Sequence, residues 1–127
     1  MARFNVVVNR FLVDELRRRG ASVAMAVLRE AGRVEAMDAS EARLLSIIAA
    51  AMPTRQVLVT NYAARVARAV AIAKDLYYAD VVRASIVLYL GGLDYVKRLY
   101  MERGARPPAA ALRTRPEWPT ALKIMGW

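Results

Sequence analysis

The sequence predicts an all-α fold: a helical bundle of about five helices with an N-terminal helical arm and an extended C-terminal tail. Apolar residues recur at spacings of three and four along most of the chain, as on the inner face of a helix. Capping residues and glycines separate these segments, and four of the five prolines lie after residue 104. We expect one domain in three parts: a basic helix-turn-helix arm over 1–36, a bundle core over 37–104 and a Pro/Arg-rich tail over 105–127.

The first part begins with a β-prone segment, RFNVVV, which predicts a short strand or an extended arm over residues 3–8. Asn9 is a good N-cap for the helix that follows, and Gly20 is placed to end that helix. Ser22 caps a second helix, which is expected to stop near Gly32.

The second part is expected to hold the bundle. Asp38 and Glu41 have capping-box spacing ahead of a third helix, and Pro53 ends that helix or opens the next. Residues 54–78 contain almost no helix breaker, so they form one long helix or two helices split near 60–61. Asp80 can cap the following helix, which is apolar nearly all round and is predicted to lie at the centre.

The last part is punctuated by glycine and proline. Gly91 and Gly92 break the central helix, a further helix spans 93–103, and Gly104 follows it. From residue 105 we expect an extended tail with a short helical turn at 120–125. Its two tryptophans would be poorly placed in water, so the tail lies on its own bundle or on a neighbouring subunit. No internal repeat is evident in the sequence.

The composition excludes several kinds of catalysis. Histidine and cysteine are absent from the sequence, so no imidazole base, thiolate nucleophile, disulfide or soft metal site can form. The acidic residues are scattered and outnumbered, and no glycine-rich phosphate loop is present. We therefore expect a protein that is not an enzyme and that holds no cofactor and no metal.

The charge predicts an anionic partner. The net charge is +9 and the isoelectric point is about 10.6, in the range of nucleic-acid-binding domains. Seventeen of the 20 cations are arginines spread along the chain, which suits phosphate neutralisation better than base reading. The arginines expected to contact double-stranded DNA are Arg10, Arg17, Arg18, Arg19, Arg29, Arg33, Arg65 and Arg68.

The location is predicted from what the sequence lacks. The first twelve residues lack the long apolar region and cleavage site of a secretory signal. No stretch approaches the ~18 apolar residues of a membrane span. We expect a cytoplasmic protein, or a virion component that is assembled in the host cytoplasm.

Residues 3–31 resemble the ribbon–helix–helix DNA-binding proteins in the order and length of their segments, a short strand followed by two helices around a glycine turn. The resemblance implies that alternate strand residues read bases. Arg3, Asn5 and Val7 would then face DNA, and Phe4, Val6 and Val8 would face inward. At the start of the second helix Ser22 fits the family's phosphate-binding position, whereas Val23, Ala24 and Met25 depart from it.

The whole chain resembles, in size, composition and layout, the major capsid proteins of filamentous viruses of hyperthermophilic archaea. That resemblance implies a protein that coats A-form DNA in a helical filament, as a homodimer or with a related second subunit. A structural protein that packages DNA without sequence preference is therefore our first expectation. The alternatives are a ribbon–helix–helix transcriptional regulator with an added helical domain, and a helical subunit that binds another protein.

Overall fold

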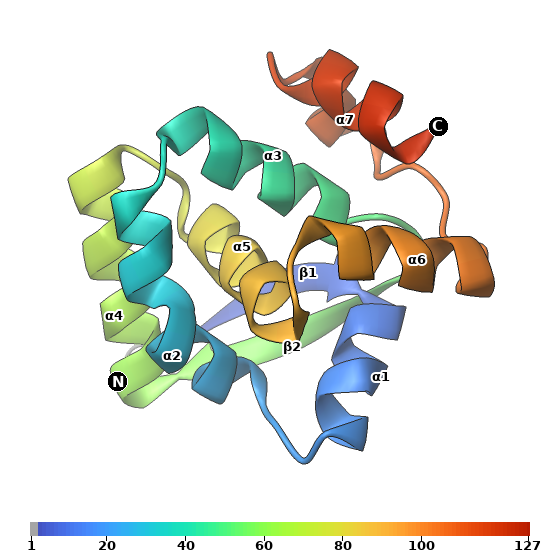
Figure 1. The fold of residues 1–127 in the computed structure, drawn as a ribbon. Helices are drawn as coiled ribbons and strands as arrows, with labels where there is room; N and C mark the ends of the chain where they lie inside the picture. The colour runs from blue at the N-terminus through green and yellow to red at the C-terminus, as the bar shows by residue number, and fades with distance from the viewer. Residues whose placement is uncertain (1–2) are drawn as a thin grey trace.

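The computed structural model describes residues 3–127. In chain order they form the following elements (Figure 1): β1 Arg3–Asn9, α1 Arg10–Arg18, α2 Val23–Ala36, α3 Ala39–Ala49, β2 Thr54–Thr60, α4 Asn61–Lys74, α5 Tyr78–Leu90, α6 Leu93–Arg103, the 3₁₀ helix η1 Ala110–Thr114 and α7 Trp118–Met125.

The all-α prediction is wrong, because β1 and β2 form an antiparallel two-stranded ribbon (Figure 1). The segment 54–60 was predicted to be helical. Its buried Val57 and Val59 alternate with exposed Gln56 and Leu58, which is the period of a strand with one buried face. The backbone hydrogen bonds of this segment are made with β1. Because β1 lies far away in the sequence, the pairing cannot be recognised from local periodicity.

The prediction of about five helices is also wrong, since residues 3–127 contain seven α-helices and one 3₁₀ helix. The predicted stop at Gly32 fails because α2 continues to Ala36. A glycine inside a helix costs about 1 kcal/mol, and burial of the neighbouring Ala31 and Val34 opposes that cost. In this part of the chain no helix is both long and apolar enough to cross a membrane.

Several helix ends lie where the sequence predicts them. The Asn9 side chain accepts hydrogen bonds from the backbone amides of Phe11 and Leu12, and Ser22 accepts one from Met25. Gly20 follows α1 with a φ of +71°, which favours glycine. Asp38 lies at the start of α3 but makes no capping hydrogen bond with its side chain.

The central position of α5 is confirmed. Its residues Val81, Val82, Ile86 and Val87 are fully buried, and α1, α2, α3, α4, α6 and β1 all pack against it. The N-terminal helices, predicted to form an arm, contribute to this same core. Leu12 of α1 is one of its largest fully buried side chains.

The C-terminal segment is not the extended tail that was predicted. It folds into η1 and α7, and α7 packs on α3 (Figure 1). Trp118 and Trp127 stack with their ring centroids 5.8 Å apart, and Ala121 is fully buried. Burial of these apolar side chains favours folding back over extension into water. The C-terminal segment therefore lies on the protein's own bundle, which is one of the two surfaces that the sequence left open for it.

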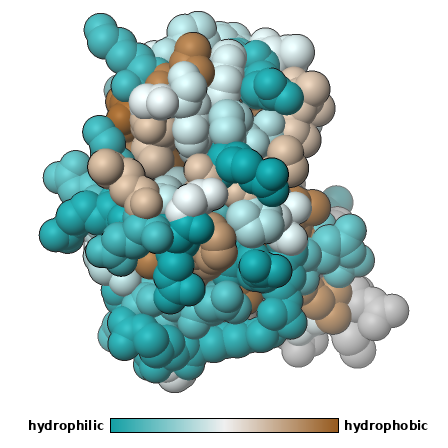
Figure 2. All heavy atoms as spheres, turned by 90° about the vertical axis from the view of Figure 1, so that its right-hand side faces the viewer, coloured by the Kyte–Doolittle hydropathy of each residue, from teal (hydrophilic) through white to brown (hydrophobic). Residues whose placement is uncertain are grey.

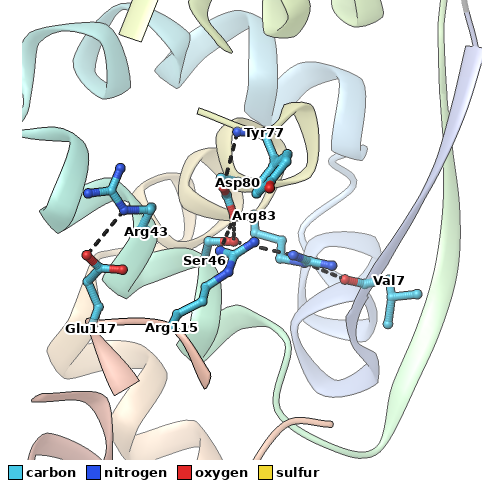
Figure 3. A network of polar contacts seen from close by, with 8 residues as sticks. All are labelled: Val7, Arg43, Ser46, Tyr77, Asp80, Arg83, Arg115 and Glu117. Atoms are coloured by element: carbon cyan, nitrogen blue, oxygen red, sulfur yellow. Dashed lines mark hydrogen bonds and ion pairs between the residues drawn. The ribbon is translucent and has the colours of Figure 1, made fainter. Parts of the chain in front are cut away.

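A buried polar network joins the C-terminal segment, α3, α5 and β1 (Figure 3). The Asp80 carboxylate accepts hydrogen bonds from the Ser46 hydroxyl and from the Arg115 guanidinium, both at 2.6 Å. It also accepts one from the backbone amide of Tyr77. Arg83 donates a hydrogen bond to the backbone oxygen of Val7 at 2.7 Å, which connects α5 to β1.

Burial of the Arg83 guanidinium lowers its pKa, and the nearby Asp80 carboxylate opposes that shift. The C-terminal segment makes a second ion pair, between Arg43 and Glu117 at 3.2 Å (Figure 3). The network therefore fixes the ribbon, the central helix and the C-terminal segment relative to one another.

Candidate nucleic-acid interface

Two segments of the chain have the same order of elements, a strand followed by two helices. The first unit is β1, α1 and α2, and the second is β2, α4 and α5, with α3 as the connection. The strands of the two units pair with each other. No repeat was evident in the sequence, because the similarity lies in burial and register more than in residue identity.

The strand register relates the two units by an approximate two-fold axis. Aligning the starts of β1 and β2 makes Val6 equivalent to Val57, and these two residues are also paired across the ribbon. An axis through this pair exchanges the strands. Under the same alignment the buried residues of α1 (Leu12, Val13 and Leu16) correspond to the buried alanines of α4 (Ala63, Ala64 and Ala67).

The helices follow the same symmetry. Each of α1 and α4 starts directly after its strand, α2 packs against β2, and α5 packs against β1. The two second helices, α2 and α5, pack on each other. The two units therefore form one body with a shared core below the ribbon.

The ribbon has one covered face and one open face. Val6, Val8, Val57 and Val59 point into the core. On the opposite face Asn5, Gln56 and Leu58 are exposed and Val7 is half-buried. These four residues make up what we call the outer face. The side chain of Arg3 was expected to point outward and that of Phe4 inward. Both side chains lie outside the described part of the structure.

A groove runs along the β2 edge of the outer face. The end of α1, the start of α2 and β2 line it, with Arg17, Ser22, Val23, Arg55, Gln56 and Leu58 among its residues. Arg17 and Arg55 are exposed and make no ion pair with any described residue. The groove therefore places two available cations next to the outer face.

Three of the eight predicted arginines form ion pairs with acids on their own helices. Arg18 and Arg19 both bind the Glu15 carboxylate on their own helix, and Arg33 binds Glu30 at 2.9 Å. These acids neutralise part of the positive charge that was expected to contact DNA. Figure 2 shows the end formed by α1, α6 and the C-terminal segment, where hydrophilic residues cover most of the lower half.

The other predicted arginines are exposed, and several lie over aromatic rings. Arg29 lies 5.9 Å from the ring centroid of Tyr89, and Arg65 is equally distant from that of Tyr62. Arg10 begins α1 directly after β1, and Arg68 is the counterpart of Arg17 in the second unit. Of the eight, Arg17 is the one shown to line the groove beside the outer face.

Gln56, Leu58 and Arg55 were not among the predicted site residues, because the segment 54–60 was predicted to be helical and is β2. The alternation of Val57 and Val59 with polar or exposed neighbours was the available signal. It is short, and the helical pattern after Thr60 concealed it.

Glu15 is expected to make stability depend on acid pH. Its side chain is 6% exposed, and the hydrogen bond from Arg18 lowers its pKa to about 2, against the opposing effect of burial. Because the folded pKa lies below the ordinary value of 4.5, this stabilisation is present above pH 4.5 and is lost as the pH falls toward 2.

Urea unfolding at about pH 6 and about pH 3 tests this expectation. The wild-type protein should lose more free energy of unfolding between the two pH values than Glu15→Gln does. The exposed Glu35 provides the control, since Glu35→Gln should behave like the wild type. Equal losses in the wild type and Glu15→Gln would contradict the expectation.

Residues 3–127 contain no group of three or more acidic, histidine or cysteine side chains placed to hold a metal ion. No family model, no curated protein and no solved structure matches this chain. The open face of the ribbon and the cations along its edge are the features that point to a ligand.

Proposed function

We propose that this protein binds double-stranded DNA by inserting the outer face of its β1–β2 ribbon into the major groove. The observation that carries this proposal is an antiparallel ribbon with one buried face and one open face, in a chain of net charge +9. The major groove of B-form DNA is about 12 Å wide and admits a two-stranded ribbon, and several DNA-binding proteins read it in this way.

The composition of the outer face supports contact with base edges. Asn5 and Gln56 carry amides that both donate and accept hydrogen bonds, and Leu58 is a large exposed apolar side chain. Arg17 and Arg55 at the β2 edge are placed for phosphate contacts. This combination of central amides and flanking cations favours a regulator of the ribbon–helix–helix type.

A coat protein that packages DNA without sequence preference is the second candidate, and the broad distribution of arginines favours it. In that case the chain would self-associate, or pair with a related subunit, in a virion. Two features weigh against it. The N-terminal helices belong to the core and the C-terminal segment lies on α3, so neither extends to wrap DNA.

Leu58→Asp is expected to weaken binding to duplex DNA by about 10-fold or more at fixed salt. The substitution places a carboxylate in the major groove of the DNA, close to the phosphates. Leu58 is 54% exposed, so the fold should tolerate the change. Fluorescence anisotropy with labelled random-sequence duplexes of about 30 base pairs, over a series of salt concentrations, measures the effect.

Ile72→Asp is the matched control. Ile72 is 75% exposed near the end of α4, and the substitution changes the net charge by the same amount. It should reduce affinity by less than about 3-fold, the effect of net charge alone. Equal losses for the two variants would show that DNA binds elsewhere on the surface, and no binding by the wild type at low salt would reject the proposal.

A further inference from the structure

We propose that the preferred DNA element is a short, approximately two-fold symmetric site with an A·T-rich centre, which one copy of the chain reads with Asn5, Val7, Gln56 and Leu58. This inference rests on the proposed binding of DNA through the outer face. A single chain supplies both halves of the recognition surface, and its side chains select the bases.

The register places the four side chains in a compact square. Asn5 is paired with Leu58, and Val7 is paired with Gln56. The two-fold axis at the Val6–Val57 pair exchanges the two amides and also exchanges Val7 with Leu58. Each strand therefore presents one amide followed, two residues later, by one branched apolar side chain.

The chemistry of these side chains selects A·T base pairs. The amides of asparagine and glutamine can form two hydrogen bonds with the N6 and N7 atoms of adenine. Apolar side chains contact the C5 methyl group of thymine, which cytosine lacks. Guanine is read most often by arginine or lysine, and neither lies among the four residues at the centre of this face.

The spacing fits neighbouring base pairs. Residues two apart on a strand are separated by about 6.6–6.8 Å, close to two base-pair steps of about 3.4 Å. Because the axis passes between the two amides, they approach adenines on opposite strands of the duplex. The symmetry of a bound element mirrors the symmetry of the protein, so the element should be an approximate palindrome.

The two halves of the surface are similar but not identical. One half carries the Asn5–Leu58 pair, and the other carries the Gln56–Val7 pair. An element read by two copies of one surface would respond equally at both halves to one substitution. Here each single variant should affect one half of the element.

Selection of bound duplexes from a randomised pool by the full-length protein tests the inference, followed by sequencing. The wild-type protein should enrich one approximate palindrome with A·T pairs at its centre, and mass measurement should find one chain per element. Asn5→Ala should relax the preference at one half by about 5- to 150-fold, and Gln56→Ala should relax it at the other half.

Gln56→Arg keeps the site polar and should change the preferred base at its half from adenine to guanine. Ser40→Ala, at an exposed position on α3, is the control and should leave the selected sequence unchanged. Circular dichroism spectra should be the same for all variants, because each substituted residue is exposed.

The remaining outcomes separate this inference from the proposed function. Binding with no enriched sequence, or with a G·C-rich centre unaffected by the variants, would overturn the inference while leaving DNA binding intact. The absence of any bound duplex would overturn both. Relaxation at both halves by Asn5→Ala alone would show that two chains bind one element, which also contradicts the inference.

Discussion

Asp80→Ala is expected to lower the free energy of unfolding by about 3–5 kcal/mol, the cost of removing one partner from a buried charge network. Asp80 is fully buried and accepts hydrogen bonds from Ser46 and Arg115. Without its carboxylate, Arg83 and Arg115 remain close together with no described anion between them. Urea unfolding at neutral pH measures the loss.

Two comparisons make this result specific. Asp94→Ala removes the same charge from an exposed position in the first turn of α6 and should cost less than about 1 kcal/mol. Asp80→Asn retains the shape of the side chain and should fall between the two. If Asp80→Ala lowered the free energy of unfolding no more than Asp94→Ala does, the network would not contribute to the stability of the fold.

Leu12→Ala is expected to cost about 2–5 kcal/mol, through lost burial and the cavity that remains. Leu12 is fully buried in α1 and is one of the largest side chains of the core. The equivalent residue in the second unit is Ala63, also buried. The two units therefore fill the shared core unequally, with large residues from α1 and small ones from α4.

The reciprocal change, Ala63→Leu, should also be destabilising, by about 1–3 kcal/mol, because it overfills a packed site. Leu28→Ala is the control, since Leu28 is 47% exposed on α2, and it should cost well under the Leu12→Ala value. Thermal unfolding of the three variants measures these effects. A cost for Leu12→Ala equal to that of Leu28→Ala would contradict the assignment of α1 to the core.

Local signals in the sequence predicted the helices better than the overall architecture. The caps at Asn9 and Ser22, the central helix and the helix 93–103 depend on nearby residues, and they agree with the structure. The ribbon depends on pairing between segments far apart in the sequence, and the packing of the C-terminal segment depends on the surface of α3. Neither can be derived from local periodicity.

The candidate site was predicted less well than the helices. Counting arginines located the charge but could not show that Glu15 and Glu30 neutralise part of it. The resemblance of residues 3–31 to ribbon–helix–helix proteins pointed to the first strand alone. The second strand, with Gln56 and Leu58, completes the open face and became evident once the register was known.

The central claim is that duplex DNA binds on the outer face of the ribbon. Two-dimensional NMR of the ¹⁵N-labelled protein, titrated with the duplex that it selects or with a random-sequence duplex, tests this claim most directly. We expect the largest amide shifts in Asn5–Val8 and Gln56–Val59 and in the adjacent groove at Arg17 and Ser22. Shifts confined to α6 and α7, or no shifts at low salt, would contradict it.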